Sequence, residues 1–134
     1  MGLQEQERKD LVKYRLEKAN TTFAEVLVHF ENQFYRTAAN RLYYACFYAA
    51  TALLLHNDYE PHTHSGVKTL LGLHFIKENK LDKSYGQLYD TLFNLRQTGD
   101  YEDWVYIEEE DVLPLVEPAR QFIKTIEKLI NNNN

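Results

Sequence analysis

The chain has 134 residues, of which 44% are hydrophobic, and its formal net charge is −5. This length suits one domain with a single core, and the acidic balance excludes a protein that coats nucleic acid through a broad basic face. No apolar run approaches the roughly 18 residues of a membrane span, and the charged N-terminus does not resemble a secretory leader, so we expect a cytoplasmic domain over residues 1–130 and a disordered Asn tail over residues 131–134.

The first two predicted elements are long helices. Residues 4–31 form an amphipathic pattern in which apolar side chains recur every three or four positions. Residues 35–56 are apolar on most sides, which is typical of the most deeply buried helix of a bundle. This second segment carries a stripe of small side chains that lets another helix approach closely, either in the same chain or in a second copy: Ala38, Ala45, Ala49 and Ala52.

Two shorter helices are predicted next. Thr63 or Ser65 can accept a backbone N–H group, so a third helix is expected to begin there and to continue to Phe75. A fourth helix is predicted over residues 84–97. Gly99 is expected to end it, because glycine is the common stop signal of helices.

The last predicted helix begins near Glu108, where acidic residues suit the positive end of the helix dipole. Pro114 and Pro118 fall inside its pattern, so we expect either a late start or a kink. No segment has the sustained alternation of a β-strand. The sequence therefore predicts an all-α fold, a four- to five-helix up-and-down bundle.

Few residues suggest metal or thiol chemistry. Cys46 lies inside an apolar segment and is expected to be a buried, inert thiol. His56, His62 and His64 cluster around the turn between the second and third helices, but no Asp or Glu joins them at helical spacing. We therefore expect no metal and no cofactor.

Arg41 places a guanidinium in an aromatic, nearly uncharged stretch of the second helix. A buried charge needs a partner, and the favoured one is a carboxylate of another helix. The alternatives are stacking on Tyr44 or Tyr48 and an anionic ligand.

Arg96 is a second candidate, at the end of the fourth helix. Asp100 and Tyr101 follow it closely, so the group could grip a phosphate and handle a proton. The simpler interpretation, which the local chemistry favours, is that Arg96 caps helix carbonyls or pairs with Asp100.

Three segments together resemble the small prokaryotic proteins of the HEPN superfamily: Ala39–Ala50, His64–Val67, and Leu95–Arg96 with Asp100–Tyr101. The resemblance extends from about residue 10 to residue 130. It implies a helical bundle that dimerises through its central helices and is often encoded beside a minimal nucleotidyltransferase, which acts as its antitoxin. Many members are toxin-like, metal-independent endoribonucleases.

The endoribonuclease activity of the family uses an Arg followed, after four to six residues, by a His. This chain departs from that pattern. The allowed positions after Arg96 hold Tyr101, Glu102 and Asp103, and those after Arg41 hold Cys46, Phe47 and Tyr48. Tyrosine has an unperturbed pKa of about 10 and is a poorer base than histidine at neutral pH.

These observations support one main hypothesis and two alternatives. The main hypothesis is a homodimeric HEPN-type protein that binds RNA, a nucleotide or a partner nucleotidyltransferase, with its nuclease motif degenerate. Its ligand-binding residues would be Arg41, Tyr44 and His64. The first alternative is an active endoribonuclease toxin that uses Arg96 with Asp100, Tyr101 or His64. The second is a non-catalytic helical adaptor.

Overall fold

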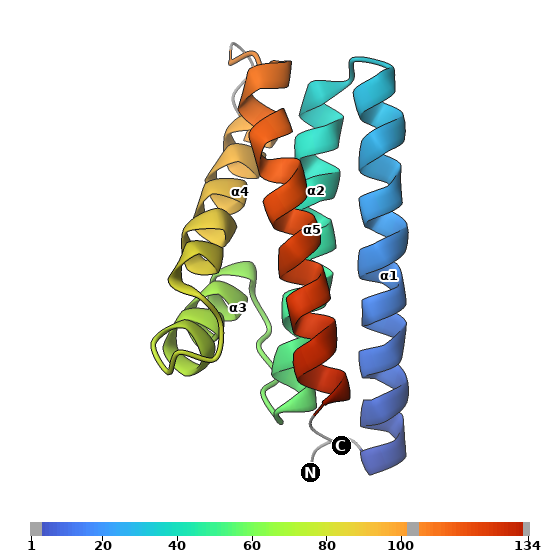
Figure 1. Cartoon of the computed structure of the whole chain (residues 1–134), viewed down its shortest axis with the longest axis vertical. Coiled ribbons are helices and arrows are strands. Elements are labelled where there is room, and N and C mark those ends of the chain that lie inside the picture. The colour runs from blue at the N-terminus through green and yellow to red at the C-terminus, as the bar shows by residue number, and fades with distance from the viewer. Residues whose placement is uncertain (1–3, 102–104, 133–134) are drawn as a thin grey trace.

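A computed structural model describes residues 4–101 and 105–132 of the chain. Within these ranges there are five α-helices, one π-helical turn and no β-strand, which confirms the all-α prediction. The elements are α1 (Glu5–Glu31), α2 (Tyr35–His56), α3 (His64–Leu71), η1 (Gly72–Ile76), α4 (Lys83–Tyr101) and α5 (Glu109–Asn131). Figure 1 shows α1, α2 and α5 side by side, with α4 and the shorter α3 on the other flank of α2.

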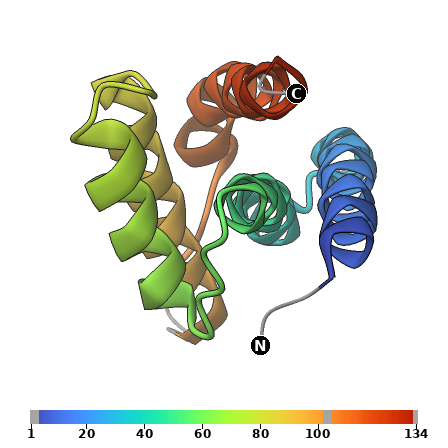
Figure 2. The same ribbon diagram turned by 90° about the horizontal axis from the view of Figure 1, so that it is seen from below.

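Helix α2 is the centre of the bundle. Seen along the bundle, it lies between α1, α5 and the pair formed by α3 and α4 (Figure 2). The small-residue stripe is buried completely inside this one chain, since Ala38, Ala45, Ala49 and Ala52 are all 0% exposed. The stripe therefore serves packing within the chain, and it offers no surface to a second copy.

The boundaries of α2 and the N-cap of α3 agree with the sequence patterns. Thr63 precedes α3, and its Oγ1 accepts a hydrogen bond of 2.9 Å from the backbone N–H of Gly66. The third helical segment continues beyond Leu71 as the π-helical turn η1, which the periodicity did not reveal. This compact turn returns the chain toward α4.

Helix α4 passes through Gly99, so the predicted stop at this residue is wrong. Gly99 is buried, and an added Cβ would stand 2.6 Å from Cδ1 of Ile107 and 3.6 Å from Cγ of Arg36. The lack of a side chain at Gly99 therefore lets Ile107, in the segment before α5, pack closely against α4. Because the helix continues, Arg96 and Asp100 stand one turn apart on it.

Helix α5 begins at Glu109, in agreement with the predicted start near Glu108, and it runs through Pro114 and Pro118. Of the two alternatives for the prolines, a late start is therefore wrong, and a kink stays a prediction. A capping box between Glu108 and Asp111 fixes the start. Both prolines are exposed. The predicted Asn tail is in part helical, because Asn131 ends α5, and residues 133–134 lie outside the described residues. No helix in the described ranges has the length and apolar character needed to cross a bilayer.

Candidate functional site

The candidate site is built around Arg96, whose guanidinium is held inside the fold by α4. The residue is only 7% exposed. Its Nη1 lies 3.8 Å from Oδ2 of Asp100, which is long for a charge-assisted hydrogen bond. Its Nε is buried and has no hydrogen-bond partner within the described residues. A buried guanidinium with so weak a pairing has donor capacity left for another anion.

Two aromatic rings of α2 support this guanidinium. The Arg96 Cζ atom lies 4.9 Å from the ring centroid of Tyr43 and 5.7 Å from that of Tyr44. Cation–π attraction of this kind is strongest where the cation is shielded from water. The rings hold the planar head group in place, so α2 and α4 together fix its orientation.

The hydroxyl of Tyr43 connects Arg96 to a histidine of a third helix. Its oxygen lies 2.8 Å from Nδ1 of His64, the first residue of α3. The imidazole also stacks on Phe47, with ring centroids 4.5 Å apart. The other ring nitrogen of His64, Nε2, is therefore the one left for a ligand.

The charge of Arg96 also affects the pKa of His64. Burial lowers the pKa of His64, and the positive charge of Arg96 lowers it further. Both effects favour the neutral imidazole, which can accept a proton. Burial raises the pKa of the Tyr43 hydroxyl, so this group acts as a neutral hydrogen-bonding link.

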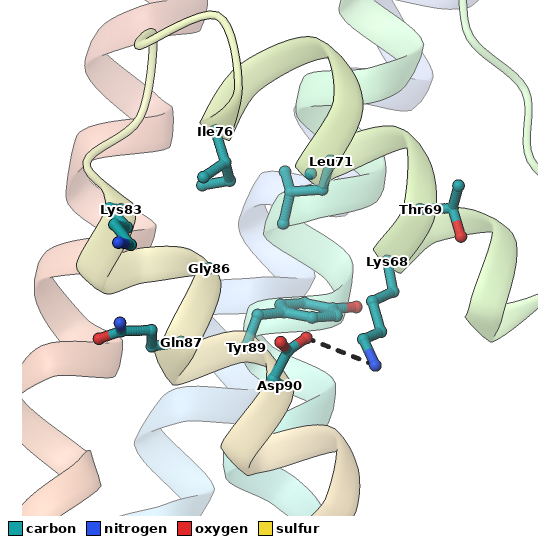
Figure 3. Close-up of a pocket in the computed structure, with 10 residues that line it drawn as sticks. Lys68, Thr69, Leu71, Ile76, Lys83, Gly86, Gln87, Tyr89 and Asp90 are labelled. Carbon is teal, nitrogen blue, oxygen red and sulfur yellow. Dashed lines mark ion pairs between the residues drawn. The ribbon is translucent and has the colours of Figure 1, made fainter.

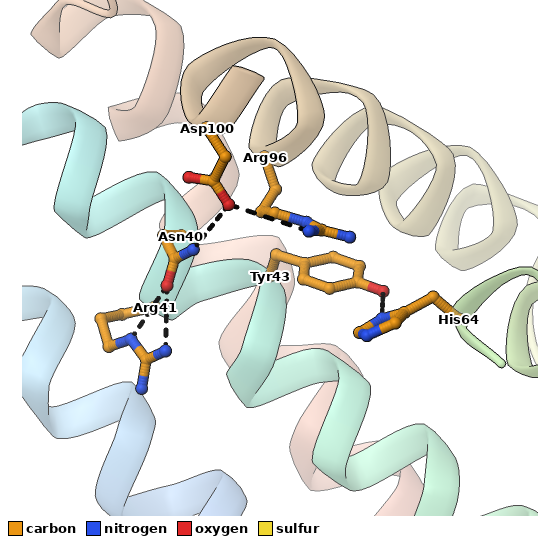
Figure 4. Close-up of polar contacts among 6 residues, drawn as sticks. All are labelled: Asn40, Arg41, Tyr43, His64, Arg96 and Asp100. Atoms are coloured by element: carbon orange, nitrogen blue, oxygen red, sulfur yellow. Dashed lines mark hydrogen bonds and ion pairs between the residues drawn. The ribbon is translucent and has the colours of Figure 1, made fainter. Parts of the chain in front are cut away.

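The side chain of Asn40 links Asp100 to Arg41 through hydrogen bonds. Its Nδ2 donates to Oδ2 of Asp100 at 3.1 Å, and its Oδ1 accepts from Nε and Nη2 of Arg41 at 3.2 and 2.9 Å. Figure 4 shows the chain of contacts from Arg41 through Asn40 and Asp100 to Arg96, with Tyr43 and His64 drawn below Arg96. We call Asn40, Tyr43, His64, Arg96 and Asp100 the Arg96 cluster.

The predicted ion pair of Arg41 with another helix is absent from the described residues. Its guanidinium instead bonds to Asn40 and lies 5.2 Å from the ring centroid of Tyr44, which was one of the alternatives. The reason is its position: Arg41 is only half-buried, so it does not need a carboxylate. Tyr101 is 73% exposed and forms no contact with Arg96 within the described residues. Residues 102–104, which include the other two positions allowed after Arg96, lie outside the described ranges.

Two members of the cluster, Asn40 and Tyr43, were not selected from the sequence. Their spacing of three residues on α2 places both on one helix face, and this was the available signal. From the sequence, His64 is one of three alternative partners of Arg96, with Asp100 and Tyr101, and no pattern chooses among them. Among the described residues, no group of three or more His, Cys, Asp or Glu side chains is arranged to hold a metal ion.

A separate cavity of 380 Å³ lies between α3, η1 and α4 (Figure 3). An ion pair of 3.5 Å between Lys68 and Asp90 stands at its edge. The ring of Tyr89 lines it, and burial together with the nearby Tyr43 raises the pKa of that phenol. Lys68 and Asp90 already pair with each other, and Lys83 is the remaining charged residue of its lining. The cavity lacks the buried, weakly paired guanidinium of the Arg96 cluster.

Comparisons with known proteins identify relatives along most of the chain. The model of the HEPN domain matches residues 12–129. A UPF0332 protein of Thermotoga maritima is 35% identical over 126 residues, which cover 94% of this chain and 96% of that protein. Two proteins of Methanocaldococcus jannaschii are named "Putative toxin MJ0605" and "Putative toxin MJ0142". They are 35% and 32% identical, over 86% and 89% of this chain and 85% and 81% of their own lengths.

Proposed function

Because the chain belongs to the HEPN domain family, we propose that it binds single-stranded RNA, or a nucleotide, by gripping a phosphate with the Arg96 cluster. The observation that carries this proposal is that Arg96 is buried and only weakly paired. Its guanidinium is 7% exposed, its Nε has no partner within the described residues, and its carboxylate neighbour is 3.8 Å away. A phosphate oxygen is the acceptor that such a fork of donors fits best.

Neighbouring groups of the cluster suit the same ligand. Arg41 is half-buried on the same side of α2 and adds a second positive charge. Aromatic rings next to cationic side chains are the usual combination in sites for single-stranded nucleic acid, because bases stack while phosphates pair. The overall charge of −5 limits this attraction to the site itself, so we expect weak binding that depends strongly on salt.

A second candidate function is metal-independent RNA cleavage, and the position of His64 favours it. The charge of Arg96 acts on His64, and Nδ1 of this imidazole is already bonded to Tyr43. Nε2 could take the proton of a ribose 2′-OH while that oxygen attacks the phosphorus to form a 2′,3′-cyclic phosphate, and the 5′-oxygen leaves with a proton from water. The toxin names of two relatives accord with this activity. His64 comes from α3, not from the position after Arg96 that the family motif uses, so we expect cleavage to be slow.

A second copy and a minimal nucleotidyltransferase are the partners that the family resemblance suggests. The alanine stripe is buried within one chain, so a dimer would have to use other surfaces. Light scattering on the purified protein measures this directly. A mass of twice 15.9 kDa is the expected result, and a monomer at high micromolar concentration would contradict it.

Fluorescence anisotropy with a labelled single-stranded RNA at low salt tests the proposed binding. Arg96→Met should abolish the signal, because it removes the phosphate donors and keeps a side chain of similar length. Arg120→Met is the matched control, since Arg120 also lies over an aromatic ring, at 5.5 Å from that of Phe23, and also pairs with a carboxylate on its own helix, Glu117. Equal loss in both variants, or no binding by the unmodified protein, would refute the proposal. Incubation of the same RNA with EDTA present tests for metal-independent cleavage, because EDTA removes the metal ions that metal-dependent nucleases require.

A further inference from the structure

Among the described residues, no helix fully covers one side of α2. Half-buried side chains follow one another along it at helical spacing, in contrast to the fully buried alanine side: Asn40, Arg41, Tyr44, Phe47 and Tyr48. We call these five residues the open face of α2. Its aromatic rings form a row, with centroids 6.0 Å apart between Tyr44 and Tyr48 and 5.8 Å apart between Phe47 and Tyr48. The row begins at Tyr44, beside Arg96, and leads away from the Arg96 cluster.

The row ends at a cavity of 220 Å³. Helix α1 contributes Arg15 to its wall, α2 contributes Phe47 and Tyr48, and α3 contributes His64. Pockets that enclose whole drug-sized ligands measure roughly 300 to 1,000 Å³. This cavity is smaller, so it suits one ring system and not a complete nucleotide.

Arg15 is the Lys or Arg side chain in this wall, and it is not part of the proposed phosphate site at Arg96. It is half-buried and forms no hydrogen bond or ion pair with the described residues. Burial lowers the pKa of its guanidinium, and the charge of Glu60 acts in the opposite direction. A guanidinium in this position can stack on a flat ring or donate to its polar edge.

His64 is part of both the Arg96 cluster and the wall of this cavity. Through Nδ1 it contacts Tyr43 of the Arg96 cluster, and its ring also lines the cavity. A strand with one phosphate at Arg96 would therefore reach the cavity with an adjoining nucleotide. The cavity also has two aromatic rings in its wall, which a site for a bare anion would not need.

We propose that the cavity between Arg15 and His64 binds a nucleobase of the RNA strand whose phosphate lies at Arg96, with Tyr48 as the stacking wall. This inference rests on the proposed RNA binding and adds a base-binding subsite to it. Stacking does not distinguish strongly among bases, since every base presents a flat face. The site is thus expected to require a base and to tolerate different ones.

The test compares a short single-stranded RNA with the same sugar–phosphate backbone lacking bases. Tyr48→Leu should weaken binding of the RNA by roughly 5- to 100-fold, the range typical for loss of one stacked base, and should leave binding of the abasic strand unchanged. Tyr14→Leu is the matched control. Tyr14 is a 56% exposed tyrosine of α1 that contacts Lys18, as Tyr48 does, and it lies outside the cavity wall.

A second pair of variants guards against misfolding of Tyr48→Leu. Arg15→Gln should weaken binding of the RNA at least about fivefold more than Lys13→Gln, which removes the same charge from the same helix away from the cavity. If Arg96→Met abolishes binding while Tyr48→Leu and Arg15→Gln match their controls, the phosphate site stands and the base subsite is refuted. Absence of binding by the unmodified protein overturns both. A change of mass in light scattering on Tyr48→Leu would assign the open face to a second copy and likewise overturn the subsite.

Discussion

Replacement of Arg96 by Met should remove RNA binding and leave the fold almost as stable as before. The free energy of unfolding contains opposing contributions from this side chain. Its unpartnered Nε costs about 1–3 kcal/mol in lost hydration, which the substitution recovers. Loss of the pair with Asp100, whose side chain is 28% exposed, costs less than about 1 kcal/mol.

The aromatic contacts of Arg96 provide the remaining contributions. Its stacking on Tyr43 and Tyr44 is worth about 2 kcal/mol at a desolvated site. A methionine sulfur against the same rings returns about 0.3–1.5 kcal/mol. The net change should therefore lie within about 2 kcal/mol of zero, whereas breaking a well-formed buried ion pair costs about 3–5 kcal/mol.

Urea denaturation followed by circular dichroism measures this difference. We expect a midpoint close to that of the unmodified protein with the same m-value. A loss of more than about 3 kcal/mol would show that Arg96 is mainly a structural residue, and the argument from its weak pairing would fail. Stability retained together with binding lost is the combination expected of a residue kept for a ligand.

Three further predictions concern other residues. Burial and, to a smaller extent, the charge of Arg96 lower the pKa of His64 below its usual 6.5, so just below that pH the unfolded chain binds more protons than the folded chain. The free energy of unfolding should therefore fall as the pH drops through about 6.5, and His64→Gln should flatten this decline. An unchanged slope for His64→Gln in urea titrations at several pH values would contradict this prediction. Arg41→Met should cost less than about 1 kcal/mol by the same titration, because Arg41 is half-buried and has no described ion pair; a cost of about 3–5 kcal/mol would restore the structural interpretation. Cys46 is 0% exposed and burial raises the pKa of its thiol, so Ellman's reagent should label it only as fast as the fold opens, and labelling at the rate of an unfolded control would refute this.

Local patterns predicted the helices well and their environments less well. The limits of α2 and the cap at Thr63 follow from neighbouring residues, and these the sequence predicted. The predicted stop at Gly99 is wrong because glycine serves both as a helix stop and as a place for close packing, and only the approach of Ile107 distinguishes the two.

The candidate site depended on packing to a greater extent. The apolar segment around Arg41 predicts burial, but Arg41 is half-buried on a side of α2 that no described helix fully covers. His64 lies near Arg96 because the chain turns back between α2 and α3, which brings His64 to Tyr43. No sequence pattern within α3 or α4 predicts this turn. The family resemblance suggested Arg96 with Asp100, Tyr101 or His64 as alternative partners, and the geometry favours Asp100 and His64 over the exposed Tyr101.

The central place of α2 has a consequence for the order in which the molecule assembles and opens. Helices α1 and α2 are joined by a short turn and pack against each other more extensively than any other pair of elements. Contacts between neighbours in the sequence form early and at low entropic cost. The Arg96 cluster instead needs α2, α3 and α4 together. A local opening that releases α3 and α4 would separate the residues of the cluster while α1 and α2 stay packed together, so we expect the site to be lost at a lower free energy than that of global unfolding.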